Sequence, residues 1–393
     1  MKIKQTIEKI PGGLMVVPLL LGGLLNTLDQ AHLPPIQAAL KAIGATAVKV
    51  ADPVTGQFRA TGNYEFLQIG GFTSALFKDG AFCLIGMFLV CVGAQMNFRV
   101  GARAVKKGAI VAASKIGAAV LAGLLMGIFL DPFNGILGLS MMTVIAGMSN
   151  GNGGMYAALT GQYGNRSDVG ALSVISLEFG PCVTMLSLGI LGQTFPLTYF
   201  IAAIVPMLLG FVLGQLDEEI GRFLRPGESL LIPFFAFALG ATMDFSVFLN
   251  GQVLAGGLLL AAATLAGTAL TAAVMLRLFG ERSQIAAVAE ASTSGNAVQT
   301  PFYVALAASA AASLAVARAT AEPGNTMLAA AATAAQEMAQ KYAAVRDVAT
   351  AQISISTVTT ALLCPIAVIL YDRWQRRRGI DARREEASDS VTP

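Results

Sequence analysis

The sequence predicts an all-α membrane protein with ten transmembrane helices, and three observations lead to that fold class. Of its 393 residues, 55% are hydrophobic and 12% are charged, roughly half the charged share of an ordinary soluble domain. The apolar runs are long and continuous instead of alternating over short segments, which excludes an outer-membrane β-barrel. Two runs are interrupted near their centres by small and amide residues, which is typical of the discontinuous helices of secondary transporters.

The individual helices follow from apolar runs bounded by charged or turn-forming residues, because a span needs roughly 20 apolar residues. Ten spans place both termini on one side of the membrane. Most lysines and arginines fall in segments on that side, including a basic tail at 373–393, which predicts that this side is cytoplasmic. The expected spans lie near residues 11–28, 78–97, 108–130, 136–161, 168–193, 198–215, 229–248, 251–279, 284–308 and 350–371.

The two halves of the chain are related in sequence. Residues 84–98 agree with residues 231–245 at seven of fifteen positions without a gap, and residues 17–22 resemble residues 205–210. A unit of five spans, an odd number, must insert upside down relative to its partner. The sequence therefore predicts a five-plus-five inverted repeat, in which the fourth and ninth spans are discontinuous and cross each other.

The predicted halves are residues 1–193 and 194–372, and each contains one segment outside the repeat. These insertions are residues 29–77 and 309–350, and the ten-span arrangement places both on the extracytoplasmic face. The second insertion is expected to become helical at about Asn325 and to continue into the last span. Each insertion could serve as a lid, as a homodimer contact or as a stabilising addition to the fold.

The two breaks predict a binding site near the membrane centre. The first has the sequence MSNGNGG at residues 148–154, and the second has the sequence EASTSGN at residues 290–296. A smooth helix cannot pass through either stretch. Half-helices that begin at such breaks present unpaired backbone N–H groups and the positive end of a helix dipole, which together attract an anion.

Four motifs stand out in the sequence, at residues 7–13, 152–157 with 162–164, 176–181 and 231–240. Together they resemble the bacterial 2-keto-3-deoxygluconate permease family. The resemblance covers nearly all of the ten-helix body, and only the insertions and the tail are expected to fall outside it. It implies cation-coupled uptake, usually described as proton symport, of an acidic sugar from pectin breakdown at the bacterial inner membrane. It also implies a fold similar to the sodium bile acid symporters, with a core domain and a panel domain.

A site for 2-keto-3-deoxygluconate needs positive potential for one carboxylate and hydrogen-bonding groups for several hydroxyls. Side chains around the two breaks supply these groups, although close helix packing would explain the same Gly, Ser and Asn residues. Lys115 lies at membrane depth and either contacts substrate or a carboxylate, or extends to the interface. The candidate substrate-binding residues are Asn150, Asn152, Gly153, Ser292, Thr293, Ser294, Asn296, Thr300 and Lys115.

Two carboxylates are candidates for coupling to an ion. Glu178 lies about ten residues into the fifth span, and apolar surroundings there would favour proton uptake, unless it forms a structural ion pair with Lys115. Glu290 could instead join Gln95 and Asn150 in an oxygen cage for sodium, as the resemblance to bile acid symporters suggests. The resemblance to the permeases favours the proton.

Gln95 and Thr242 occupy equivalent positions in the repeat and are further candidates at the crossing point. No cofactor beyond the coupling ion is predicted. The expected partners are a small anionic sugar acid and the lipid bilayer, with no nucleic acid.

Other functional classes find little support in the sequence. It contains no nucleotide-binding loop, no nucleophile elbow and no metal-ligand cluster, so an enzyme is not expected. All four cysteines lie in apolar spans and form no disulfide pattern. A channel would not need two broken helices related by an inverted repeat. The remaining alternative is an exporter, or a sodium-coupled carrier of another organic anion.

Overall fold

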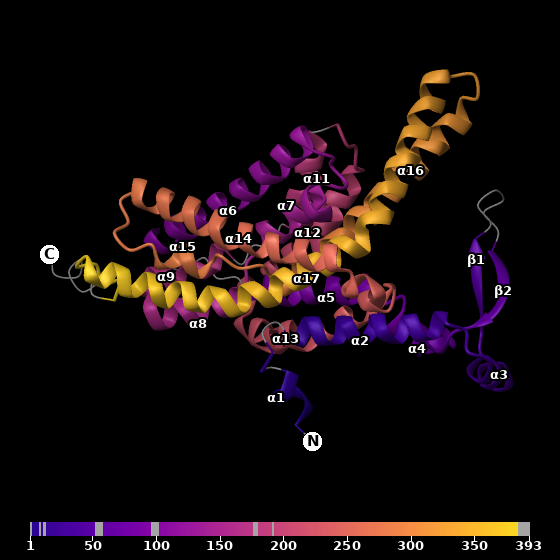
Figure 1. Ribbon diagram of the computed structural model, residues 1–393, viewed down its shortest axis with the longest axis horizontal. Coiled ribbons are helices and arrows are strands. Elements are labelled where there is room, and N and C mark those ends of the chain that lie inside the picture. Colours follow the sequence, from indigo (N-terminus) through magenta and orange to yellow (C-terminus); the bar gives the residue numbers. More distant parts are fainter. Residues whose placement is uncertain are drawn as a thin grey trace.

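Helices dominate the computed structural model, as the sequence predicts (Figure 1). Within the described residues, seven helices are long and apolar enough to cross a membrane, or up to nine if each of two bent helix pairs is one span. Many large apolar side chains on their outer faces are exposed, as contact with lipid requires. The chain is therefore a multi-pass helical membrane protein, while the number ten and the inverted repeat stay predictions. The structure describes residues 2–7, 9–10, 13–51, 58–95, 102–175, 180–190 and 192–383.

The helix bounds agree with the predicted apolar runs, with some runs divided. The bent pairs are α4 (Gly71–Phe77) with α5 (Ala81–Ala94), at 61°, and Arg166–Ile175 with α11 (Gly180–Ile190), at 64°. The seven candidate spans are α2 (Gly13–Gln30), α6 (Ala102–Phe129), α12 (Leu197–Leu216), α13 (Glu218–Gly240), α14 (Gly251–Leu278), η4 with α16 (Gly295–Ala321) and α17 (Thr326–Arg377). The shorter elements are α1 (Ile3–Ile7), α4 (Gly71–Phe77), α5 (Ala81–Ala94), η2 (Ile136–Gly138), α9 (Arg166–Gly170), α10 (Leu172–Ile175), α11 (Gly180–Ile190) and η3 (Phe245–Leu249).

Four helices form one packed group in which α2 lies against α13 and α5 lies against α12. Glycines allow these backbones to approach closely. A Cβ atom on Gly240 of α13 would lie 2.0 Å from the carbonyl oxygen of Leu19, and one on Gly93 of α5 would lie 2.0 Å from that of Met207. In the predicted repeat α2 corresponds to α12, and α5 corresponds to α13. The contact between α2 and α13 in this group is therefore equivalent to the contact between α12 and α5.

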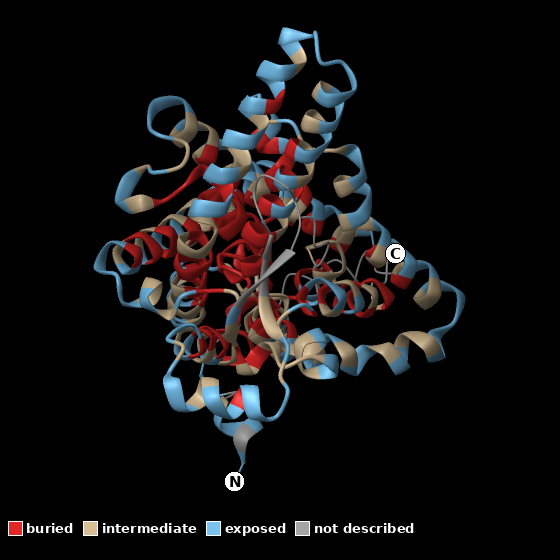
Figure 2. Ribbon diagram, turned by 90° about the vertical axis from the view of Figure 1, so that its right-hand side faces the viewer, coloured by how far each residue is buried: buried red, intermediate tan, exposed pale blue. Residues whose placement is uncertain are grey.

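The second group of helices surrounds the two breaks. α6 packs against α14 and against the half-helix that precedes the first break, while α17 packs against both α14 and α16. Buried residues gather in the middle of the end-on view, and exposed residues mark the projecting helix ends (Figure 2). Residues 148–150 of the first break and residues 290–294 of the second belong to this buried interior.

α13 begins earlier than the sequence predicted. The apolar run predicted a span from residue 229, whereas the helix starts at Glu218 and continues through Pro226. The Asp217 carboxylate accepts the N–H of Glu219 and caps this start, and two acidic residues occupy the first turn.

The first insertion contains a β-hairpin that the sequence analysis did not predict. β1 (Ala47–Ala51) pairs antiparallel with β2 (Phe58–Tyr64), after the short helix α3 (Pro34–Ala42) and before η1 (Phe66–Gln68). The Asp29 carboxylate at the end of α2 accepts two backbone N–H groups at the start of η1, which ties the insertion to the membrane helices.

The second insertion is a helical hairpin made by the end of α16 and the start of α17. The Asn325 side chain accepts the N–H groups of Met327 and Leu328, and α17 then runs for 52 residues without interruption. The prediction of a helix that begins near Asn325 and continues into the last span is confirmed. Both insertions project from the end of the molecule opposite the C-terminus (Figure 1).

Candidate functional site

The first break separates α7 (Met141–Ser149) from α8 (Gly153–Tyr163), as the sequence predicted. Asn150 and Asn152 adopt extended backbone conformations between these half-helices. The side-chain oxygen of Asn152 accepts the N–H of Met155 at 3.0 Å and so caps α8. An amide residue at this position therefore starts the second half-helix inside an apolar run.

The second break follows α15 (Ile285–Ala289) and ends where η4 (Gly295–Val298) begins. Hydroxyl groups of α17 form hydrogen bonds with the backbone of this break. Thr360 Oγ1 accepts the N–H of Thr293 at 3.0 Å, and Thr357 Oγ1 donates to the carbonyl oxygen of Ser294 at 3.2 Å. This support was not predicted from the sequence, although the run of Ser and Thr at residues 354–360 in an apolar span indicates it.

The two breaks touch each other directly. The N–H of Ser294 donates to the carbonyl oxygen of Asn150, and the N–H of Asn152 donates to Ser292 Oγ, both at 3.0 Å. A Cβ atom on Gly151 would lie 1.7 Å from Glu290 Oε1, so this glycine is required for the close approach. Two segments about 140 residues apart thus form one structural unit.

A cavity of about 340 Å³ lies where the breaks meet. Its opposite wall comes from the other helix group, through Met15 of α2, Phe88 and Val92 of α5, and Ile232 of α13. The cavity therefore lies between the two groups. Its polar lining comprises Asn150, Asn152, Glu228, Ser294 and Asn296.

The half-helix starts leave backbone donors at this cavity. In the described part of the chain, the N–H groups of Gly153, Gly154, Gly295 and Asn296 donate to no protein acceptor, and all four residues line the cavity. The side-chain nitrogen of Asn150, Nδ2, also has no hydrogen-bond partner in this part of the chain. Such a concentration of donors suits a carboxylate and hydroxyl groups.

Lys115 holds the far side of the second break. Its ammonium group donates to the carbonyl oxygens of Glu290 at 2.6 Å and Ser292 at 2.7 Å, and it lies 3.5 Å from Glu290 Oε1. Both side chains are almost fully buried. Lys115 thus contacts a carboxylate and does not extend to the interface. Its ion-pair partner is Glu290, while Glu178 lies outside the described residues.

Some predicted site residues lie behind the breaks and not at the cavity. Ser292, Thr293 and Thr300 are buried and are absent from the cavity lining. Ser292 joins the two breaks, and the Thr293 hydroxyl bonds with Ser356 of α17 at 2.7 Å. These residues hold the site together, whereas Asn150, Asn152, Gly153, Ser294 and Asn296 face the cavity.

The hydrogen bonds of Gln95 and Thr242 go to groups other than Glu290 in the described part of the chain. The Gln95 amide donates to Glu228 and to the carbonyl oxygen of Cys91, and the Thr242 hydroxyl donates to the carbonyl oxygen of Leu239. In the same part of the chain, no three His, Cys, Asp or Glu side chains gather into a metal site.

Glu228 is a cavity residue that the sequence analysis missed. It lies one turn before Ile232 on α13, just before the span predicted at 229–248. Its Oε2 atom accepts a hydrogen bond from Gln95 at 3.0 Å. A charged residue three positions before the repeat motif at 231–245 was the available signal.

Comparisons with known proteins agree with the motifs. A family model described as 2-keto-3-deoxygluconate permease matches residues 4–49 and 54–331. The chain is 41% identical over 309 residues to 2-keto-3-deoxygluconate permease 1 of Salmonella typhimurium, covering 78% of this chain and 85% of the relative. It is 33% identical over 379 residues to the 2-keto-3-deoxygluconate permease of Bacillus subtilis, covering 95% and 94%. The expectation that both insertions fall outside the family is wrong, because the match includes most of 29–77 and continues to residue 331.

Proposed function

Because the chain belongs to the 2-keto-3-deoxygluconate permease family, we propose that it imports 2-keto-3-deoxygluconate or a related sugar acid by proton symport. The transporter would lie in the bacterial inner membrane with both termini in the cytoplasm. The cavity where the two breaks meet supports this proposal most directly. Its volume of about 340 Å³ suits a small molecule, and its backbone donors suit a carboxylate.

The position of the cavity between two helix groups supports alternating access. Movement of one group against the other would open the cavity to each side in turn. The breaks belong to one group, so the substrate would stay bound to Asn152 and Asn296 while the wall formed by Phe88 and Ile232 moves.

The surroundings of Glu290 favour a proton over sodium as the coupling ion. Sodium would need oxygen ligands at the break, but the ammonium group of Lys115 already binds the carbonyl oxygens of Glu290 and Ser292. Glu178 remains our first candidate for proton binding, on the sequence argument alone.

Uptake of labelled 2-keto-3-deoxygluconate into proteoliposomes tests substrate and ion together. We expect accumulation under an imposed proton gradient and none under a sodium gradient alone. Glu178→Gln should abolish accumulation against a gradient but permit exchange of substrate across the membrane. A sodium requirement at a fixed proton gradient, removed by Glu290→Gln, would reverse the assignment, and net efflux under both gradients would indicate an exporter.

Asn152→Ala and Asn296→Ala should each weaken substrate affinity about tenfold to a hundredfold, because each removes a hydrogen-bonding group from the cavity lining. Asn152 also caps α8, so Asn152→Ser provides a check: serine restores the cap but not the amide. Substrate affinity should therefore be low in Asn152→Ser as well, whereas the melting temperature of Asn152→Ser should be higher than that of Asn152→Ala. Asn134→Ala, at an exposed loop position, is the control. Unchanged affinity in both alanine variants would contradict the assignment.

A further inference from the structure

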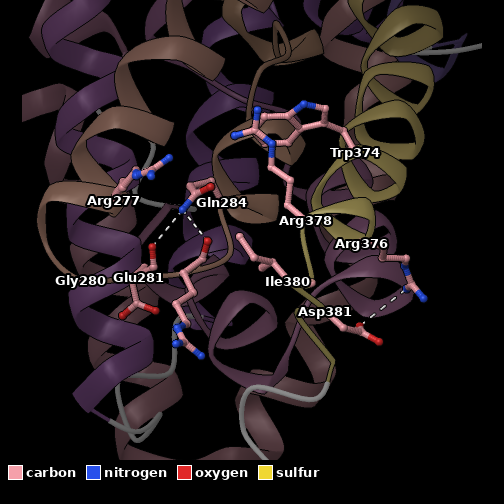
Figure 3. A pocket seen from close by; sticks show the side chains of 11 residues that line it. Arg277, Gly280, Glu281, Gln284, Trp374, Arg376, Arg378, Ile380 and Asp381 are labelled. Atoms are coloured by element: carbon pink, nitrogen blue, oxygen red, sulfur yellow. Dashed lines mark hydrogen bonds and ion pairs between the residues drawn. The ribbon is translucent and has the colours of Figure 1, made fainter.

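A second cavity, of about 970 Å³, lies between the ends of α14 and α17. Five residues from the end of α14 and the loop after it line one side, and six from the end of α17 and the turn after it line the other (Figure 3). They are Arg277, Gly280, Glu281, Arg282 and Gln284, and Trp374, Arg376, Arg378, Gly379, Ile380 and Asp381. Gly280 and Gly379, with φ angles of 89° and 77°, turn the chain away at the two helix ends. The cavity lies at the C-terminal end of the molecule, which the basic residues predict to be cytoplasmic.

Arginine side chains give this cavity a positive charge. Four arginines line it, and within the part of the chain that the structure describes, Arg376 alone among these four has a carboxylate partner. The Arg378 guanidinium lies 4.1 Å from the centre of the Trp374 ring, and this stacking orients it (Figure 3). The four arginines are Arg277, Arg282, Arg376 and Arg378.

The two acidic residues in the lining do not cancel this charge. Glu281 is almost buried and pairs with Lys107 at 3.4 Å and Arg103 at 3.0 Å, both outside the lining. Asp381 lies 3.8 Å from Arg376. The remaining guanidinium groups form a site for an anion, and planar guanidinium groups match the oxygens of a phosphate.

Exposed apolar side chains lead from the membrane-spanning parts of both helices to the cavity. On α14, Leu270 and Val274 are 67% and 56% exposed and precede Arg277 on the same face. On α17, Leu370 is 58% exposed and lies one turn before Trp374. A lipid can place acyl chains along these surfaces and its headgroup in the cavity, whereas a soluble anion would not use them.

We propose that this cavity binds the phosphate headgroup of an anionic membrane lipid. Basic cavities between transmembrane helices on the cytoplasmic side bind such headgroups. The site is separate from the cavity at the breaks, and the proposal does not depend on which substrate the protein carries.

Native mass spectrometry of the full chain in detergent tests the proposal, with phosphatidylglycerol and phosphatidylcholine as competing probes. We expect a preference for phosphatidylglycerol that falls about thirtyfold in the double variant Arg277→Gln/Arg378→Gln. The matched control is Arg373→Gln/Arg377→Gln, which removes the same charge from exposed arginines of α17 outside the lining. The control should keep the preference.

Three results would overturn the proposal. The unaltered protein could show no preference for the anionic lipid. Both double variants could lose the preference equally, which would indicate general surface charge and not a site. Inorganic phosphate could bind with the same dependence on Arg277 and Arg378 and displace the lipid at millimolar concentration, which would make the ligand a soluble anion.

Discussion

Gly151→Ala should reduce substrate uptake about tenfold to a hundredfold without removing the protein from the membrane. The added Cβ atom would lie 1.7 Å from Glu290 Oε1 and 2.4 Å from its carboxyl carbon. Glu290 is buried and paired with Lys115, so its carboxylate cannot move aside without separating that pair. Either the two breaks move apart or the ion pair is lost, and overpacking of this kind costs about 1–3 kcal/mol.

Gly161→Ala is the matched control for this prediction. Gly161 lies in α8, the half-helix that follows the same break, and its added Cβ atom would meet nothing within 4 Å. Uptake in this variant should equal that of the unaltered protein. Equal uptake in both variants would show that contact between the breaks is not required for transport.

The membrane fold and the position of the site were predictable from the sequence because both depend on local composition. Apolar runs defined the helices, and the glycine and amide residues at 150–154 defined the first break. The contact between the breaks was predictable from their repeat-related positions. Which site residues line the cavity and which support the breaks from behind was not predictable. Ser294 lines the cavity and Thr293 bonds with α17, and this difference depends on the local backbone path and on the neighbouring helix.

Charged residues were the least predictable part of the sequence. Lys107 was assigned to a cytoplasmic loop, yet it is fully buried and lies 2.6 Å from Asp168. Glu228 was assigned to a loop, yet it lines the cavity. In both cases the partner lies far away in the chain. The sequence near Lys107 could therefore not show that a distant carboxylate compensates its burial.

Lys115→Met should destabilise the protein by about 3–5 kcal/mol, because it leaves the buried carboxylate of Glu290 without its cation and two carbonyl oxygens without their donor. The measurement is thermal unfolding of the purified protein in detergent. Lys41→Met, at an exposed position of α3, should leave the melting temperature unchanged.

The double variant Lys115→Met/Glu290→Gln separates stability from transport. Removing both charges eliminates the uncompensated carboxylate, so the double variant should recover much of the stability lost in Lys115→Met. Transport should not recover, because the ammonium group that fixes the carbonyl oxygens of the second break is still missing. If the double variant regained both stability and proton-driven accumulation, Lys115 and Glu290 would have only a structural role at the crossing of the two breaks.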